Sequence, residues 1–353
     1  RPGGNLLLLG GSFAFSILLF LAFSVLLQFM RHAVNPLKPY APDLSIVSRN
    51  NGRTIDGGLP ARLEELSGVE RAYGRAFAYG LSGGMKDGET GIDLISYEKY
   101  QFDWAEEDLL EGSLDFIGEE NAGGEKRVLL GYDAAHPVSV GERIRIRTER
   151  EEEEVVVAGI LSKMPFDAST GGICIICSEG TFRAMTGDDG LTCVDVQLAR
   201  GASDQDVERI REAAGENVTF SDKRLSNGEV KGAFWSFALF VYGFLAIIAL
   251  ITILNIVNSI GMSVNARMKQ YGAMRAIGMS CAQLEKMILA EALTYALGGS
   301  AAGSVLGLWI HRLLFEAMVN ERWGSPWEIP WEALVMIVAL VLVSAAAAVC
   351  GPA

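Results

Sequence analysis

The sequence lacks the short motifs that mark the common nucleotide-binding and hydrolytic sites. Its 353 residues contain no G-x-x-x-x-G-K-[ST] loop, no H-E-x-x-H and no G-x-S-x-G, which excludes a P-loop for ATP, a zincin site and a nucleophile elbow. The three histidines, His32, His136 and His311, are too far apart to predict a metal cluster. We therefore expect no enzyme active site, no metal and no cofactor in this chain.

Cysteine is also scarce, and its five copies do not predict a redox centre. Cys174 and Cys177 form a C-x-x-C, but the context "GGICIICSE" predicts a strand. Residues i and i+3 of a strand point to opposite faces, so these thiols should not meet. They are either buried and inert, or one of them pairs with Cys193. The acidic run Glu151–Glu154 is a solvated charge run rather than a metal site.

Four long apolar runs dominate what is present. A helix needs roughly 20 residues to cross the hydrocarbon core of a bilayer, and each run reaches about that length. The sequence therefore predicts four transmembrane helices, at Leu6–Met30, Phe234–Ile260, Met287–Leu314 and Trp331–Val349.

Charge is distributed unevenly between these runs. Residues 33–232 hold 37 acidic and 22 basic side chains, which argues against nucleic acid as a partner. The short loop at 262–286 holds Arg267, Lys269, Arg275 and Lys286 against Glu285 alone. Basic residues in short loops mark the cytoplasmic side. We expect that loop and both termini in the cytoplasm and the acidic region outside.

The acidic region has the pattern of an α+β domain. Val155–Val157, "ICIIC" and "CVDVQLA" predict strands, and Ile144 and Ile146 alternate with arginines on another. In "SDQDVERIREAAG", Ser203 and Asp206 form a capping box at the start of a helix. The fold class is thus a membrane protein with four transmembrane α-helices and a large α+β extracytoplasmic domain between helices 1 and 2.

The loop after the second run predicts a basic amphipathic helix. Met268, Tyr271, Met274, Arg275 and Met279 recur at steps of three or four residues. Such a helix either lies on anionic lipid or docks on a partner protein.

The third run has a stripe of small residues. Gly299, Gly303 and Gly307 recur every fourth residue, which lets another helix approach closely. The approaching helix belongs either to the same chain or to a second copy. Glu291 in this run needs a partner, and we expect Lys286 or Arg275 to pair with it.

The segment "QYGAMRAIGMSCAQ" resembles a motif of the FtsX-like or MacB-like (type VII) ABC transporter permeases. Their pattern is E-[IY]-G-x-[LM]-R-A-[ILF]-G-[AM]-S followed by Gln, and Gln270 here replaces the usual Glu. Glu291 and "GGSAAGSVLG" are similar to the family's third span, and "LSGVERA" and "VSVGERIRI" to its outer domain. The matching positions are Tyr271, Gly272, Met274, Arg275, Ala276, Ile277, Gly278, Met279, Ser280 and Gln283.

The resemblance implies a permease subunit in a bacterial plasma membrane that pairs with a separate cytoplasmic ATPase and a second permease, as a homo- or heterodimer. It divides the chain into transmembrane helix 1 at 1–31, an extracytoplasmic MacB-core-like domain at 32–232 and an FtsX-like permease domain at 233–353. The ATPase would bind a coupling helix near 264–284. Its contact residues would be Arg267, Lys269, Tyr271, Gly272, Met274, Arg275 and Gly278, with Tyr271 and Met274 as apolar anchors.

Two functions follow from that resemblance. ATP-driven motion would be transmitted to the outer domain to export, extract or expel a substrate, a mechanism called mechanotransmission. Alternatively, the chain is a non-transport regulator or sensor that controls a cell-wall hydrolase or a signalling partner. The substrate is not named by any motif.

Overall fold

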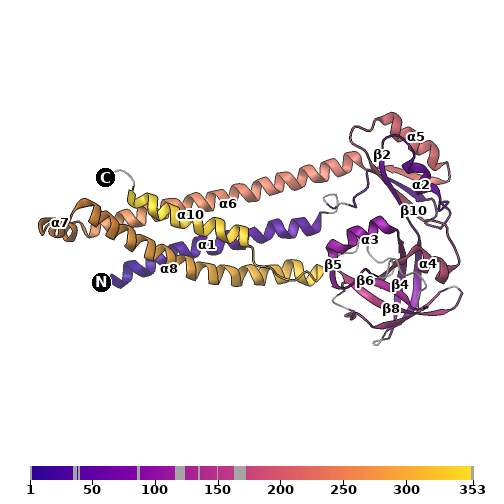
Figure 1. The fold of residues 1–353 in the computed structure, drawn as a ribbon, viewed down its shortest axis with the longest axis horizontal. Helices are drawn as coiled ribbons and strands as arrows, with labels where there is room; N and C mark the ends of the chain where they lie inside the picture. Colours follow the sequence, from indigo (N-terminus) through magenta and orange to yellow (C-terminus); the bar gives the residue numbers. More distant parts are fainter. Residues whose placement is uncertain are drawn as a thin grey trace. The chain divides into compact units, whose positions relative to one another are not determined.

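The structure is a computed structural model, and it describes residues 2–34, 38, 40–85, 88–115, 124–133, 136–148, 150–162 and 172–350. The chain divides into two compact units. The helical unit comprises residues 1–33, 234–320 and 326–353, and the α/β unit comprises residues 34–233 and 321–325. Figure 1 shows both in sequence colours.

The described residues of the helical unit form four long helices and one short one. Their bounds are α1 Pro2–Ala33, α6 Arg224–Ala266, α7 Met268–Ala276, α8 Cys281–Phe315 and α10 Trp331–Cys350; α8 continues into a π-helical turn, η4 Glu316–Asn320. The four long helices are long and apolar enough to cross a membrane, which fits the four predicted spans. In this unit, α7 lies at the end where α1 begins and α10 ends (Figure 1).

Apolar side chains hold the long helices together. Phe13, Ile17 and Leu21 of α1 lie in one buried cluster with side chains of α6, α8 and α10. Other apolar side chains of α6, such as Leu239 and Phe240, are exposed. A helix that is apolar on all sides in this way is suited to a lipid environment.

The part of the α/β unit that the structure describes contains two sheets. The first is antiparallel with the order β11-β1-β10-β2, and the second has the order β5-β8-β6-β9-β4-β3-β7. Because β7 also pairs with β8, six of the seven strands close into a barrel. The strands are β1 Leu44–Ser48, β2 Val69–Arg75, β3 Phe77–Met85, β4 Gly88–Tyr97, β5 Leu109–Gly112, β6 Lys126–Gly131, β7 Arg143–Arg147, β8 Glu152–Leu161, β9 Ile173–Ser178, β10 Cys193–Leu198 and β11 Val218–Asp222.

Short helices connect these strands. They are α2 Leu59–Glu64, α3 Lys99–Ala105, the 3-10 turn η2 Glu106–Asp108, α4 Glu179–Thr186, α5 Asp204–Ala214 and α9 Glu321–Trp323. Leu63 of α2 and Ile210 of α5 pack on Leu44, Ile46 and Val194 of the first sheet. The predicted capping box is confirmed, since Ser203 accepts from Asp206 N–H and Asp206 accepts from Ser203 N–H. The α+β architecture is therefore confirmed.

The predicted alternation of strand side chains is also confirmed. In β7, Ile144 and Ile146 are buried and the arginines beside them are exposed. Cys177 lies in the barrel core, while Cys174 lies with Cys193 in a separate buried cluster, so the two C-x-x-C thiols do point apart. All three are free thiols.

Candidate functional site

The candidate site is the segment from Arg267 to Gln283, which joins α6 to α8 at one end of the helical unit. α7 occupies its first half, with Arg267 as the N-cap residue. After α7 the backbone turns at Gly278, whose φ of +110° is a conformation that residues with a side chain rarely adopt. Ser280 then caps α8, because its Oγ accepts from Gln283 N–H at 3.3 Å.

Several motif residues therefore have a structural explanation. Gly278 makes the turn, and Ser280 and Gln283 form a capping box, in which Gln283 Oε1 accepts from Ser280 N–H at 3.0 Å. Tyr271 is 6% exposed and lines a small cavity with Ile260 of α6 and Glu291 of α8. Burial raises the pKa of its phenol. These residues hold the segment in its conformation.

The structure corrects the expected role of Tyr271. Periodicity placed Tyr271 and Met274 on one face of the helix, and the family resemblance implied that both are apolar anchors for the ATPase. Tyr271 points into the helical unit instead. The helix is short and turns sharply at both ends, so its inward face is set by α6 and α8. Periodicity alone does not reveal which face that is.

Glu291 is paired, but with a different partner from the one expected. Its Oε1 lies 2.6 Å from Arg267 Nη1 and accepts from Tyr295 Oη at 2.8 Å. Among the residues that the structure describes, neither Lys286 nor Arg275 forms an ion pair with Glu291, so the expected partners are corrected to Arg267. The carboxylate of Glu291 raises the pKa of Arg267. This pair ties the start of α7 to α8.

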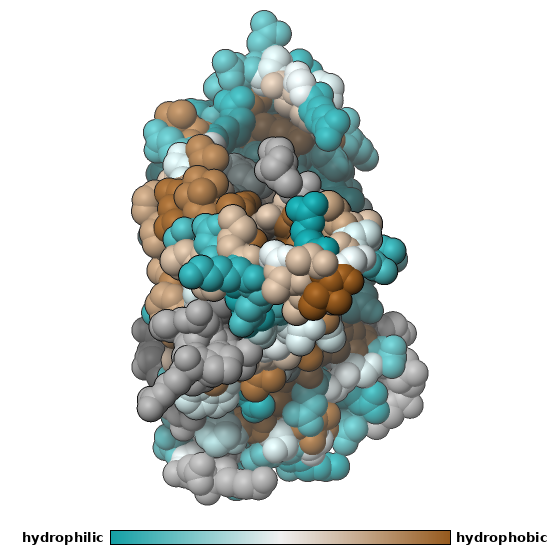
Figure 2. Space-filling view, turned by 90° about the vertical axis from the view of Figure 1, so that its left-hand side faces the viewer, coloured by the Kyte–Doolittle hydropathy of each residue, from teal (hydrophilic) through white to brown (hydrophobic). Residues whose placement is uncertain are grey.

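The other predicted contact residues remain on the surface. Met274 and Ile277 are 37% and 88% exposed. An added Cβ at Gly272 would meet nothing within 4 Å, so packing within the described chain does not require a glycine there. Figure 2 views the molecule from this end and shows hydrophilic and apolar side chains interspersed at the front. The exposed residues between Met268 and Ile277 are Met268, Lys269, Gln270, Gly272, Ala273, Met274, Arg275, Ala276 and Ile277.

The glycine stripe of α8 packs against α1 of the same chain. Gly299, Gly303 and Gly307 are all buried. A Cβ on Gly303 would lie 2.7 Å from Ala14 Cα, and one on Gly307 would lie 3.2 Å from Leu18 Cα. At Gly303 and Gly307, the structure thus supports internal packing rather than a seam between two copies.

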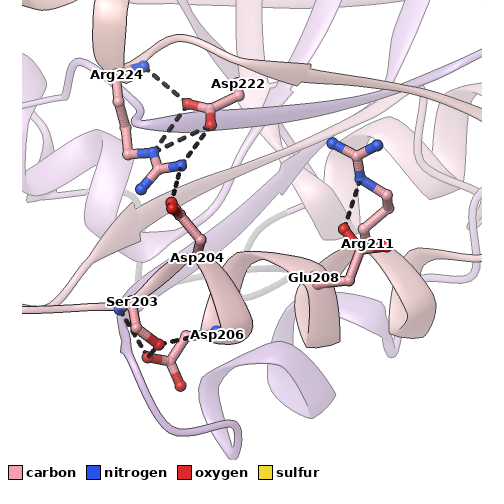
Figure 3. Close-up of polar contacts among 7 residues, drawn as sticks. All are labelled: Ser203, Asp204, Asp206, Glu208, Arg211, Asp222 and Arg224. Carbon is pink, nitrogen blue, oxygen red and sulfur yellow. Dashed lines mark hydrogen bonds and ion pairs between the residues drawn. The ribbon is translucent and has the colours of Figure 1, made fainter.

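A polar network fixes the first turn of α6 within the α/β unit, a feature the sequence analysis missed. Figure 3 shows Arg224 between Asp222, at the end of β11, and Asp204, at the start of α5. Arg224 Nη2 lies 2.7 Å from Asp222 Oδ2 and 3.0 Å from Asp204 Oδ1. The Arg224 side chain also lowers the pKa of Asp222. An Asp-x-Arg at a strand-to-helix junction was the available signal.

Comparison with known proteins agrees with this arrangement. The family model described as "MacB-like periplasmic core domain" matches residues 11–213, and the family model described as "FtsX-like permease C-terminal" matches residues 242–353. No curated protein matches the chain.

Two solved structures are similar to part of the chain. The periplasmic region of MacB from Actinobacillus actinomycetemcomitans has a TM-score of 0.40 and 10% identity, and the match covers 53% of this chain and 92% of that one. The extracellular domain of the noncanonic ABC-type transporter YknZ from Gram-positive bacteria has a TM-score of 0.36 and 14% identity, covering 49% and 89%. The two family matches together include most of the sequence, and the chain belongs to the FtsX-like and MacB-like permease family.

Proposed function

We propose that this chain is the permease subunit of an ABC transporter that transmits ATPase-driven motion to an extracytoplasmic domain. The family normally works with a cytoplasmic ABC ATPase. The observation that carries the proposal is that a face of α7 exposes basic and apolar side chains together. Packing and helix capping within the described chain do not explain why these side chains are there. Arg275, Met274 and Ile277 on this face offer a cation beside two apolar side chains. Such a surface suits an acidic, partly apolar groove on a partner protein.

Two connections would carry motion away from α7. The Arg267–Glu291 pair ties α7 to α8, so a pull on α7 acts on the third span. α6 is a single helix of 43 residues, about 65 Å long at 1.5 Å per residue. Its first turn is bonded to the α/β unit through Arg224, and its last residue precedes the N-cap residue of α7. In this proposal the motion ends in the α/β unit and expels, extracts or exports a substrate.

The proposed orientation places α7 in the cytoplasm and the α/β unit outside, between helices 1 and 2. The positive charge of the 262–286 loop supports this orientation. The position of α7 at the end where α1 begins and α10 ends supports cytoplasmic termini as well.

Cysteine labelling in intact cells tests the orientation. An impermeant thiol reagent should label a cysteine placed at Gly124, in the α/β unit, and spare one placed at Gln270, on α7. Among the cysteines whose side chains the structure describes, Cys281 alone is exposed, and a Cys281→Ser background removes its thiol. Labelling of position 270 but not of position 124 would reverse the topology.

Transport is preferred over regulation because the match to the MacB-like core domain spans residues 11–213, more than half of the chain.

A second permease subunit completes the proposed assembly. The exposed apolar side of α6, which includes Leu239, Phe240 and Leu250, would contact lipid or that second permease.

The docking test compares two charge reversals of equal size at the same end of the helical unit. Arg275→Glu alters the proposed docking face, whereas Lys286→Glu alters an exposed residue of the first turns of α8. Loss of a hot-spot contact costs about 2 kcal/mol, or roughly thirtyfold in affinity. We expect Arg275→Glu and Met274→Ala to reduce co-purification of the ATPase, and Lys286→Glu to leave it unchanged.

The two charge reversals also test the alternative, in which α7 lies on anionic lipid and binds no ATPase. Each cationic side chain near an anionic surface contributes about 1 kcal/mol, so both reversals would then weaken membrane contact alike and ATPase binding would survive. Equal ATPase recovery from the Arg275→Glu variant and the native chain rules out the docking role. The four-helix fold does not depend on this outcome.

A further inference from the structure

The first sheet of the α/β unit has one apolar face and one polar face. Leu44 and Ile46 of β1 pack under α2 and α5, whereas Ser45 and Val47 alternate with them and point to the opposite side. The neighbouring strands repeat this pattern. The polar face carries Ser45 and Val47 of β1, Tyr73 and Arg75 of β2, and Cys193 and Asp195 of β10.

Polar groups on this face are nearly out of contact with solvent. Asp195 has a side chain 4% exposed, and it accepts from Ser45 Oγ and from the guanidinium of Arg75. Arg75 Nε also donates to Cys193 Sγ at 3.4 Å. In a buried ion pair, the attraction between the two charges often does no more than offset the free energy needed to remove them from water. The fold alone thus gives a weak reason for a charged pair here.

The pair forms one wall of an open pocket of about 370 Å³. Phe77 and Tyr79 form another wall, with their rings stacked at 5.3 Å between centroids and 12° between planes. Pockets of this size with an apolar wall and a few fixed polar groups are typical of small-molecule sites. The remaining lining residues are Tyr40, Ala41, Pro42, Asn51, Thr192, Lys223 and Asn227.

The charges of the lining residues favour an anion. They include two cations, Arg75 and Lys223, and one carboxylate, Asp195. Asp195 neutralises Arg75 directly, which leaves the ammonium group of Lys223 as the net charge of the pocket. A carboxylate ligand would complete the charge balance.

We propose that this pocket binds a small aromatic or apolar molecule that bears one carboxylate. Lys223 receives the carboxylate, and the stacked rings of Phe77 and Tyr79 receive the apolar part. This ligand would touch the start of α6, because Lys223 immediately precedes α6 and Asn227 lies in its first turns. Asn227 Nδ2 donates to Pro42 O at 2.8 Å, and Lys223 N–H donates to Asp43 O at 2.8 Å.

This proposal stands apart from the ATPase partnership, because the site lies within the α/β unit and its test measures binding alone. The probes are indole-3-acetate and its uncharged analogue indole-3-acetamide, titrated by calorimetry into the full chain in detergent micelles. A hydrogen bond to a charged group is worth roughly tenfold in affinity or more. We expect the carboxylate to bind at least tenfold more tightly than the amide.

Two lysine variants form a matched pair. Lys223→Met should abolish the preference for the carboxylate, and Lys231→Met, at an exposed position of α6 outside the pocket, should retain it. Tyr79→Ala should weaken both probes. If a variant fails to fold, the native chain alone still tests the proposal. Equal affinity of the native chain for the two probes, or no saturable binding of either, overturns the proposal. A preference that survives Lys223→Met overturns it as well.

Discussion

The crossing of α8 over α1 gives the most direct test of the membrane fold. At Gly303 an added Cβ would lie 2.7 Å from Ala14 Cα and 2.8 Å from Ala14 O, against an ordinary contact of 3.4–4 Å. Both atoms belong to the α1 backbone, so no side-chain rotation relieves the clash. The helices would have to separate by about 1 Å, and overpacking of this kind costs about 1–3 kcal/mol.

Gly298, on the same helix, is the matched control. It is exposed, and a Cβ there would meet nothing within 4 Å. Alanine is favoured over glycine in a helix by up to about 1 kcal/mol. Gly303→Ala should therefore lower the free energy of unfolding by about 1–3 kcal/mol, while Gly298→Ala should leave it unchanged or raise it.

Gly307→Ala should change the free energy of unfolding by an amount between those of Gly303→Ala and Gly298→Ala. Its closest clash, at 2.7 Å, is with the end of the Leu21 side chain, which can move more easily than backbone. The assay is reversible unfolding in mixed micelles, followed by tryptophan fluorescence, with monomeric protein confirmed by light scattering. Equal stabilities for the variants at positions 303 and 298 would show that α1 does not cross α8 at Gly303.

Two further predictions concern the α/β unit. Burial raises the pKa of Glu98 to about 7, against the opposing effect of its hydrogen bond from Gly74 N–H at 2.6 Å. The folded state thus holds this proton more tightly than the unfolded state. The contribution to stability is present below pH 4.5 and is lost as pH rises through 7, by up to about 3 kcal/mol. Denaturation at several pH values should show this slope flattened by Glu98→Gln and kept by Glu216→Gln, at an exposed position whose charge does not act on Glu98. At the foot of α6, Arg224→Leu should reduce ATP-dependent activity of the assembled complex with less than about 1 kcal/mol lost in stability, because its ion pairs are partly exposed. Arg211→Leu, which removes a 3.6 Å pair with Glu208 and a cation–π contact with Phe220, should leave that activity intact. Equal activities for the two variants would contradict the role of Arg224.

The sequence predicted those elements whose pattern arises locally. The four spans follow from length and hydropathy, and α5 follows from the capping box of Ser203 and Asp206. β7 follows from strict alternation of isoleucine and arginine. In each case the deciding residues are neighbours in the chain, so one segment carries the whole signal.

The sequence misled where pairing with distant segments decides the structure. The glycine-rich segment "LSGGMKDGETG" has the composition of an exposed loop, yet its described residues belong to β3 and β4. Gly83 pairs with Thr90 on one side and Ile146 on the other. A Cβ on Gly83 would collide with Ile92 Cδ1, so the glycine is a packing requirement rather than a sign of a loop.

The run Val69–Tyr79 has the sequence pattern of one continuous strand, yet it contributes to two strands in different sheets. The chain passes from β2 to β3 at Ala76, whose N–H donates to Ser96 Oγ at 2.7 Å. Ala76 and Phe77 are both buried, so the hydrophobic pattern of the sequence continues across the point where the chain leaves one sheet and enters the other. Nothing local marks the change of sheet.

The motif that led to the family serves two purposes, and the structure separates them. Tyr271, Gly278 and Ser280 act within the chain, by packing, turning and capping. Met274 and Arg275 have exposed side chains on α7. If both groups are needed for function, their loss should appear differently: substitutions in the first group should lower stability, and substitutions in the second should lower partner binding in a protein of native stability. A short sequence motif can thus be required throughout while only its exposed residues recognise the partner.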